Sequence, residues 1–101
     1  MNLPTCNLSI IIVNWNTRDL LAACLESVES STLHVSGSKG QPSTFNLQLE
    51  TIVVDNASSD GSAAMVRARF PWVRLVENGE NVGFARANNQ GIALAQGRYV
   101  L

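Results

Sequence analysis

The stretch LSIIIVNWN, residues 8–16, decides the fold of this 101-residue chain. Its first part, residues 8–13, is an apolar and mostly β-branched run of strand length. A strand with one face in water would alternate apolar and polar residues, so this continuous run predicts a central strand of a parallel sheet. The residues that follow, Asn-Trp-Asn-Thr, predict a polar loop at the carboxyl end of that strand.

Outward from this strand, the chain alternates helical and strand patterns. Helices are predicted over residues 18–29, 62–69 and 84–96, and further strands over residues 49–54, 73–76 and 99–101. This βαβαβαβ order predicts an α/β fold with a parallel sheet, right-handed crossovers and helices on both faces. Residues 30–46 break the pattern, and their Ser and Gly content predicts a long, inserted, flexible surface loop.

Capping signals precede two of the predicted helices. Asn16 or Thr17 is suited to cap the first helix, because a side-chain oxygen there can accept a free amide N–H. Ser59 or Asp60 is suited to cap the second helix in the same way. The apolar stripe of the first helix includes Cys24, which predicts a thiol that faces the sheet.

Composition and charge exclude several classes of protein. Seven basic and eight acidic residues give a net charge of −1, which offers no electrostatic reason to expect nucleic acid as a partner. No run approaches the ~20 apolar residues of a membrane span, and residues 10–13 are too short for a signal peptide, so a cytoplasmic location is the default expectation. Cys6 and Cys24 are too few for a disulfide framework, and we interpret them as buried or idle thiols. His34 falls in the predicted loop and has no partner histidine for a zinc or Ser-His-Asp site.

Polar residues follow each of the first three predicted strands. In open parallel sheets, ligands bind at the carboxyl ends of the strands, so these loops are expected to converge on one rim. These loops suit a nucleoside, because they offer a large aromatic ring on which a base can stack. They also offer amides and a carboxylate for hydrogen bonds, and a glycine that lets the backbone approach a ligand. The candidate binding residues from this argument are Asn14, Trp15, Asn16, Asp55, Asn56, Asn81 and Gly83.

Three of these candidates have a plain structural alternative. Trp15 offers a face on which a nucleobase can stack, or it merely lids the sheet. Asp55 binds ligand, or its side chain caps the turn that follows it. Gly83 opens a helix whose free amides favour phosphate, or it is an ordinary helix-start glycine. The first turn lacks a G-x-G-x-x-G pattern, which excludes a dinucleotide site of that kind, and no Gly-Lys-Ser/Thr triplet marks a P-loop.

Four segments in order resemble family 2 glycosyltransferases: residues 8–16, 52–62, 81–91 and 97–101. They are similar to the family's first strand and loop, its second strand and turn, its N-x-G-x-x-x-A-x-N-x-G segment and the approach to its metal strand. The resemblance implies a Rossmann-like GT-A fold that binds a nucleoside-diphosphate sugar for transfer to an acceptor hydroxyl. The motifs most resemble those of bacterial rhamnosyltransferases for surface polysaccharide.

The resemblance also implies roles for individual positions. The nucleoside would be held by Asn14, Trp15, Asn16 and Asp55, and the segment from Asn81 to Asn89 would line the same pocket. The family holds a divalent metal, Mg or Mn, through an acidic motif just after the fourth strand. No Asp or Glu follows Glu80 here, so the metal ligand and the catalytic base are expected to lie outside this chain. The acceptor would be a glycan or a lipid-linked sugar, with peripheral association at the inner membrane face.

We therefore expect residues 1–101 to be the N-terminal, nucleotide-sugar-binding part of an incomplete GT-A domain. Such a part would be inactive in transfer by itself and prone to associate through its short fourth strand. Two alternatives stay open at this point. One is a non-catalytic remnant without a ligand, and the other is a different nucleotide-binding transferase, such as a nucleotidyltransferase. The polar Asn-Trp-Asn loop argues against the latter, which would use a Gly-rich, basic first loop.

Overall fold

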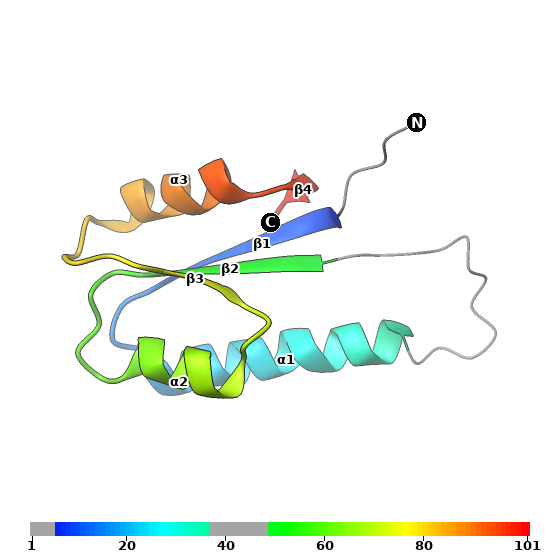
Figure 1. Ribbon diagram of the computed structural model, residues 1–101, viewed down its shortest axis with the longest axis horizontal. Helices are drawn as coiled ribbons and strands as arrows, with labels where there is room; N and C mark the ends of the chain where they lie inside the picture. The colour runs from blue at the N-terminus through cyan, green and yellow to red at the C-terminus, as the bar shows by residue number, and fades with distance from the viewer. Residues whose placement is uncertain (1–5, 37–48) are drawn as a thin grey trace.

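The computed structural model describes residues 6–36 and 49–101. Helices and strands alternate along them (Figure 1), with the bounds β1 (Cys6–Asn14), α1 (Arg18–Ser36), β2 (Leu49–Asp55), α2 (Ser62–Arg69), β3 (Arg74–Glu77), α3 (Phe84–Leu94) and β4 (Gly97–Val100). These strands form one parallel sheet in the order β3-β2-β1-β4. The predicted α/β fold is confirmed, and β1 lies inside the sheet between β2 and β4.

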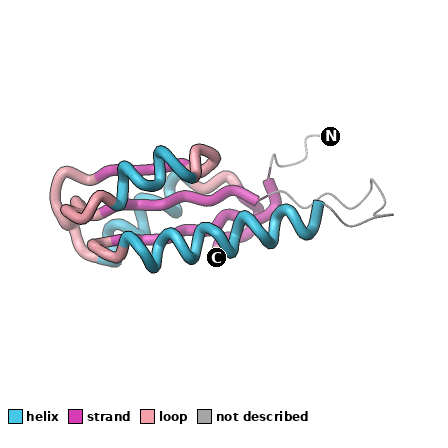
Figure 2. The backbone as a smooth tube through the Cα atoms, turned by 90° about the horizontal axis from the view of Figure 1, so that it is seen from below, coloured by secondary structure: helices cyan, strands magenta, loops and turns pink. Residues whose placement is uncertain are grey.

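Helices cover both faces of the sheet. In Figure 1 and Figure 2, α1 and α2 lie on one face and α3 on the other. The side chains of β2 alternate between the two layers, as the two-residue period of a strand requires. Val53 packs in one cluster with Leu25 of α1, whereas Ile52 and Val54 pack in a second cluster with Ala87 of α3. The continuous apolar run in β2, residues 52–54, therefore contributes to the hydrophobic clusters on both faces of the sheet.

Helix α3 lies very close to the sheet at Gly91. A Cβ atom added there would lie 2.4 Å from Cγ2 of Ile11 and 3.5 Å from Cγ2 of Val54. The first distance is shorter than real Cβ contacts allow. The absence of a side chain at Gly91 thus sets how near α3 lies to β1.

The first helix is longer than predicted. It continues through residues 30–36 and ends at Ser36, so a loop beginning at residue 30 is wrong, and His34 is helical. Once a helix has formed, each added residue gains a hydrogen bond, and Ser and Thr oppose this only weakly. The first helix-breaking residues are Gly37, Gly40 and Pro42. The rest of the predicted loop, residues 37–46, lies outside the described residues.

The inward face of α1 also differs from the prediction. Leu21, Ala22 and Leu25 are buried, whereas Cys24 is exposed and free. The buried stripe is rotated toward Ala22, which places Cys24 on the solvent side of it. The prediction that this thiol faces the sheet is therefore wrong.

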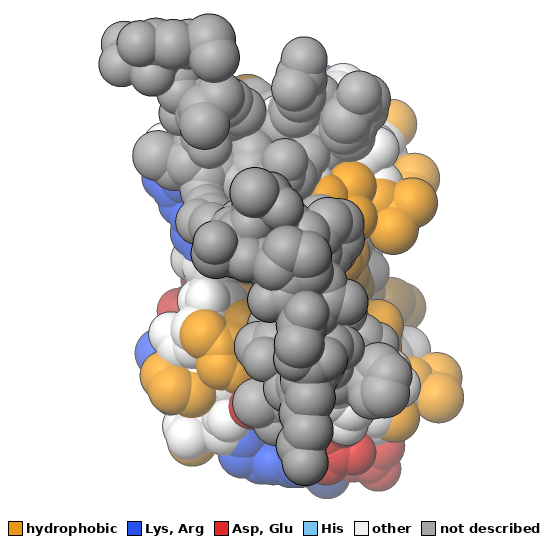
Figure 3. All heavy atoms as spheres, turned by 90° about the vertical axis from the view of Figure 1, so that its right-hand side faces the viewer, with side chains coloured by type: hydrophobic (Ala, Val, Ile, Leu, Met, Phe, Trp, Pro, Cys, Tyr) orange, Lys and Arg blue, Asp and Glu red, His pale blue; other side chains and the backbone are white. Residues whose placement is uncertain are grey.

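Strand β4 forms one edge of the sheet. It begins at Gly97, two residues earlier than predicted. The N–H of Gly97 donates to Oγ of Ser9 at 2.8 Å. Pairing continues to the last residue, because the N–H of Leu101 donates to the carbonyl of Ser9 at 2.7 Å. Val100, Leu101 and the nearby helical Ile92 expose apolar surface. Viewed from the amino ends of β1 and β2, the molecule shows hydrophobic side chains in separate groups (Figure 3).

Among residues 6–36 and 49–101, no helix combines the length and the apolar character needed to cross a membrane.

Candidate functional site

The carboxyl ends of β1 and β2 are aligned residue by residue. Asn14, the last residue of β1, is the register partner of Asp55, the last residue of β2. The main chain stays paired one step further, because the N–H of Asn56 donates to the carbonyl of Asn14 at 2.9 Å. This alignment brings the first two predicted loops side by side at one edge of the sheet.

Asp55 places a carboxylate in the buried floor of this edge, with only 3% of the residue exposed. Its Oδ1 accepts hydrogen bonds from Nδ2 of Asn14 at 2.8 Å and from Oγ of Ser58 at 2.7 Å. Its Oδ2 accepts the main-chain N–H of Ser58 at 3.0 Å. The turn-capping alternative for Asp55 is thus present in the structure, and it fixes the carboxylate in place.

Asn14 is equally buried and fully bonded. Its Nδ2 donates to Asp55 and, at 3.2 Å, to Oγ of Ser58. Its Oδ1 accepts the hydroxyl of Thr17 at 2.6 Å. Thr17 therefore uses its side chain on the floor of the site and does not cap α1.

A carboxylate from the neighbouring turn caps α1 instead. Oδ2 of Asp60 accepts the N–H of Arg18 at 2.9 Å, and Oδ1 accepts the N–H of Ser62, the first residue of α2, at 3.0 Å. One charged side chain thus serves the starts of both helices, and it is a stronger acceptor than the predicted Asn16 or Thr17. The hydroxyl of Ser62, followed by the N–H groups of Arg18 and Ser62, lowers the pKa of Asp60 below its ordinary value of 3.8.

Trp15 stands at the surface between two anchored neighbours. Asn14 on one side is buried, and Asn16 on the other has a left-handed φ of 53°. The N–H of Asn16 donates to Oγ of Ser58 at 2.8 Å, and its Oδ1 accepts the N–H of Ser59 at 2.8 Å. With both neighbours held, 55% of Trp15 remains exposed. The indole therefore offers a large part of its surface to solvent at this edge.

Asn56 ties the end of β2 to the entrance of α3. It is 2% exposed, and its Nδ2 donates to the carbonyl of Gly83 at 3.2 Å. Its Oδ1 accepts Nδ2 of Asn78 at 2.9 Å and the N–H of Val82 at 3.4 Å. Every polar atom of the Asn56 side chain is thus used within the protein, so its role is to hold the third loop against the second.

Asn78 extends this network to the body of α3. It exchanges two hydrogen bonds with the side chain of Gln90, at 2.8 and 3.0 Å. Neither residue was among the predicted site residues, and Ser58 was also missed. Asn78 carried a usable signal, because it comes two residues after the predicted strand 73–76, close to its carboxyl end.

The remaining predicted residues lie around the start of α3. Oδ1 of the exposed Asn81 accepts the N–H of Gly83 at 2.8 Å, and Gly83 precedes the helix with no side-chain cap. Asn89 is exposed, and the buried Ala87 and Gly91 define the sheet-facing side of α3. Helical spacing puts Asn89 on the opposite side. The structure gathers the other predicted residues at one edge and leaves Asn89 apart.

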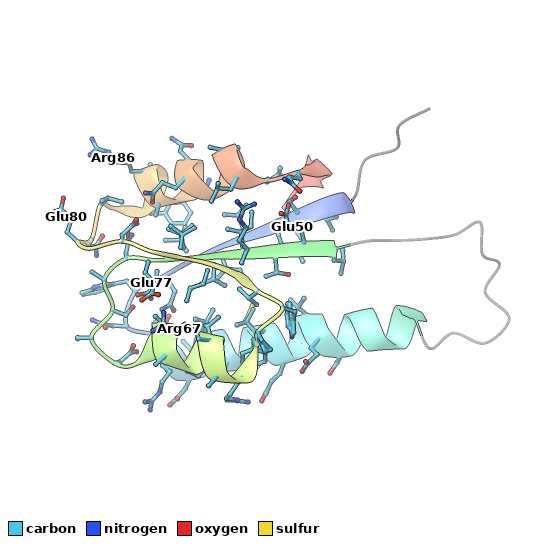
Figure 4. The ribbon with its side chains drawn as sticks, in the orientation of Figure 1. Glu50, Arg67, Glu77, Glu80 and Arg86 are labelled. Carbon is cyan, nitrogen blue, oxygen red and sulfur yellow. The ribbon has the colours of Figure 1, made fainter. Side chains whose placement is uncertain are left out.

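Charged side chains from several elements lie around this edge. In Figure 4, Arg86 on α3 and Glu80 in the preceding turn both point outward, whereas Arg67 and Glu77 point toward each other and form an ion pair. An open hollow beside α1 is lined by Asn16, Thr17, Arg18, Asp19, Leu20 and Asp60. In the part of the chain that the structure describes, no group of three His, Cys, Asp or Glu residues is placed to hold a metal ion. These residues therefore do not fit a metal site.

The described residues thus form a parallel α/β sheet with hydrogen-bonded polar loops at its carboxyl edge, an arrangement of the GT-A type. Residues 9–101 match the family model described as glycosyl transferase family 2, and the chain belongs to that family. The resemblance inferred from the motifs is confirmed at this level.

Curated relatives agree with this assignment. The chain is 31% identical over 99 residues to the glycosyltransferase YibD of Escherichia coli K12, covering 95% of this chain and 25% of YibD. It is 27% identical over 95 residues to the succinoglycan biosynthesis protein ExoO of Rhizobium meliloti strain 1021, covering 93% of this chain and 24% of ExoO. The chain spans about a quarter of the length of these relatives.

Solved structures show the same fold. A mannosyltransferase from Pyrobaculum calidifontis, PcManGT in complex with GDP-Man and Mn²⁺, superposes with a TM-score of 0.69 at 29% identity, covering 96% of this chain and 27% of that one. TarS of Staphylococcus aureus, residues 1–349, superposes with a TM-score of 0.71 at 21% identity, covering 94% of this chain and 26% of that one. The predicted GT-A architecture is confirmed.

Proposed function

We propose that this chain supplies the nucleoside-binding part of a glycosyltransferase that moves a sugar from a nucleoside diphosphate to an acceptor hydroxyl. The observation that carries the proposal is the joining of the three loops at one sheet edge, through Asn14 to Asp55 and through Asn56 to Gly83. Family membership and the GDP-Man complex of a structural neighbour support it. The name of the relative ExoO supports a place in surface polysaccharide synthesis.

Trp15 carries the largest binding contribution in this proposal. Its exposed indole offers a flat face for a base, and base–aromatic stacking contributes ~1–3 kcal/mol. Nδ2 of Asn16 and Nδ2 of Asn81 donate no hydrogen bond within the described residues, so both are available to ligand oxygens. Asp55 is the proposed carboxylate of this site; it is 3% exposed and accepts hydrogen bonds from Asn14 and Ser58.

The start of α3 is proposed to receive the phosphates. Gly83 leaves open space where a side chain would stand, and no side chain caps the first turn of the helix. Free N–H groups and the helix dipole favour an anion at such a position. Asn56 acts here by holding Gly83, and Asn89 faces away from this group.

The rest of the reaction is assigned to other parts of the enzyme. The described residues do not fit a metal site, so a divalent metal, Mg or Mn, and the catalytic base are proposed to belong outside residues 1–101. Residues 1–101 alone are then expected to show no transfer. The resemblance to rhamnosyltransferases and the glycan or lipid-linked acceptor belong to the same proposal and follow from the motifs, which do not specify the donor sugar. The cytoplasmic, membrane-peripheral location is part of the proposal as well.

Titration of the 101-residue chain with UDP, GDP and dTDP tests this function. Trp72 is a second exposed fluorophore, so the titration uses a Trp72→Phe background. We expect at least one nucleoside diphosphate to quench Trp15 emission, and calorimetry to report binding. Trp15→Ala should weaken that binding by roughly 5- to 150-fold, since 1.4 kcal/mol is tenfold, and Trp15→Phe should retain part of it. Absence of binding to all three nucleotides would overturn the proposal and favour a remnant without a ligand.

A further inference from the structure

The Ser58 hydroxyl joins the first two loops at a single atom. It donates its one proton to Oδ1 of Asp55 at 2.7 Å. It accepts the main-chain N–H of Asn16 at 2.8 Å and Nδ2 of Asn14 at 3.2 Å. A hydroxyl has one donor and two acceptor positions, so this group is saturated by protein partners. Ser58 therefore has no free position with which to bind a ligand itself.

The loops that Ser58 joins have unusual backbone conformations. Asn16 and Ala57 both adopt left-handed φ angles, 53° and 62° respectively. Such conformations are uncommon for residues other than glycine and persist where surrounding contacts hold them. For Asn16, the contacts that do so are the bond from its N–H to Ser58 and the bond from the N–H of Ser59 to its Oδ1.

The position of Trp15 depends on these contacts. Its indole is exposed, and no ring contact or hydrogen bond within the described residues fixes it. The main chain on either side of it is held, at Asn14 by the N–H of Asn56 and at Asn16 by the hydroxyl of Ser58. Among the residues that the structure describes, Ser58 alone has a side chain that bonds both of those neighbours and also the carboxylate of Asp55.

We propose that Ser58 is a positioning residue of the nucleoside site, which sets the direction of the Trp15 indole and the Asp55 carboxylate without touching the ligand. The inference rests on the proposed function for its effect on affinity. Removal of the hydroxyl frees the N–H of Asn16 and leaves Nδ2 of Asn14 with one partner. Asp55 retains Asn14 and the main-chain N–H of Ser58. The floor of the site then stays in place, while the Trp15 loop loosens because Asn16 keeps only the bond from the N–H of Ser59 to its Oδ1.

The primary variant is Ser58→Ala in the Trp72→Phe background. We expect the steady-state anisotropy of Trp15 to fall without any ligand, because the indole moves more freely. Affinity for the nucleoside diphosphate that the parent binds should fall about tenfold, the size expected from losing one hydrogen bond near a charged group. Ser59→Ala is the matched control. The Ser59 hydroxyl lies 3.5 Å from Oδ1 of Asn16, and the stronger bond from its main-chain N–H survives the substitution.

Ser58→Thr and Ser58→Val separate the hydroxyl from the shape of the side chain. Both are branched in the same way, and Thr alone keeps the hydroxyl. Thr should restore both the anisotropy of Trp15 and the affinity, and Val should not. If circular dichroism shows that Ser58→Ala does not fold, this pair decides the question by the same two measurements.

Equal anisotropy and affinity in Ser58→Ala and the parent would overturn the inference, as would equal losses in the Thr and Val variants. A parent chain that binds none of the nucleotides overturns the proposed function instead. In that case the ligand-free anisotropy series still decides whether Ser58 holds Trp15.

Discussion

Replacement of Gly91 by alanine sets two physical effects against each other. Gly91 lies in the interior of α3, where alanine is favoured over glycine by about 1 kcal/mol of helix stability. The new Cβ would, however, lie 2.4 Å from Cγ2 of Ile11 and 3.3 Å from its Cδ1. Both of those atoms belong to a strand inside the sheet, so the helix must shift or the side chain must leave its rotamer.

The size of the steric clash decides whether the free energy of unfolding falls or rises. Inserting a methyl group into a packed interface costs about 1–3 kcal/mol, which exceeds the propensity gain over most of that range. We therefore expect Gly91→Ala to lower the free energy of unfolding by about 0–2 kcal/mol. Asn89→Ala, on the solvent side of the same helix, should raise it by up to about 0.7 kcal/mol, because only propensity changes there.

A double-mutant cycle with Ile11 identifies the contact. Ile11→Ala removes the colliding Cγ2 atom, so Gly91→Ala should become stabilising in that background. Ile11→Val keeps an equivalent methyl group and should leave the penalty in place. The coupling with alanine should reach about 1–3 kcal/mol, as expected for residues in direct contact. Urea unfolding followed by circular dichroism gives the free energies.

One result of this series would refute the reasoning. If Gly91→Ala stabilised the parent chain by the full propensity gain, α3 would not lie as close to β1 as described. The position of Gly83, which α3 carries, would then also need revision.

Two further predictions concern pH and association. Because the pKa of Asp60 is lowered in the folded chain, its contribution to stability is complete above the ordinary value of 3.8 and is lost as pH falls through the lowered value. Urea titrations at pH 2–7 should show this loss, and Asp60→Asn should flatten the dependence of stability on pH. Identical profiles for the two chains would contradict this prediction. Val100 and Leu101 are exposed at the β4 edge, and we expect the chain to self-associate there as its concentration rises. Val100→Lys should reduce this association, because a charge on an edge strand opposes strand pairing. If size-exclusion chromatography finds both chains monomeric at all concentrations, this prediction is wrong.

The fold could be predicted from the sequence because its elements have strong and separate signals. The apolar run of β1 indicated an interior strand. Helix α2 has the predicted bounds, and Pro71 shortly after it accounts for where it ends. The length of α1 could not be predicted as well. Ser and Thr are common in loops, yet they do not stop a helix that is already formed, and the first glycine comes only at position 37.

The meeting of the polar loops could be predicted from the sequence, and the hydrogen bonds among them less well. Polar residues at strand ends predicted that these loops converge on one edge, which the structure shows, and Trp15 is exposed there. Which hydroxyl contacts Asp55 depends on the left-handed turn at Ala57, a residue type that seldom adopts this conformation. That turn directs Ser58 toward Asp55, and no local pattern in the sequence distinguishes Ser58 from Ser59. The hydrogen bonds among neighbouring loops therefore could not be predicted from the sequence.

The amide network at the entrance of α3 has a consequence for ionic strength. The bonds among Asn56, Asn78 and Gln90 join neutral groups, which have no proton to gain or lose between pH 2 and 12 and no net charge for salt to screen. The exposed ion pair of Arg67 with Glu77, which links α2 to β3, weakens as salt rises. Concentrated salt should therefore loosen the α2 side of the sheet while the α3 entrance keeps its shape. The entrance of α3 would therefore keep its geometry across changes of salt and acidity that alter its charged neighbours.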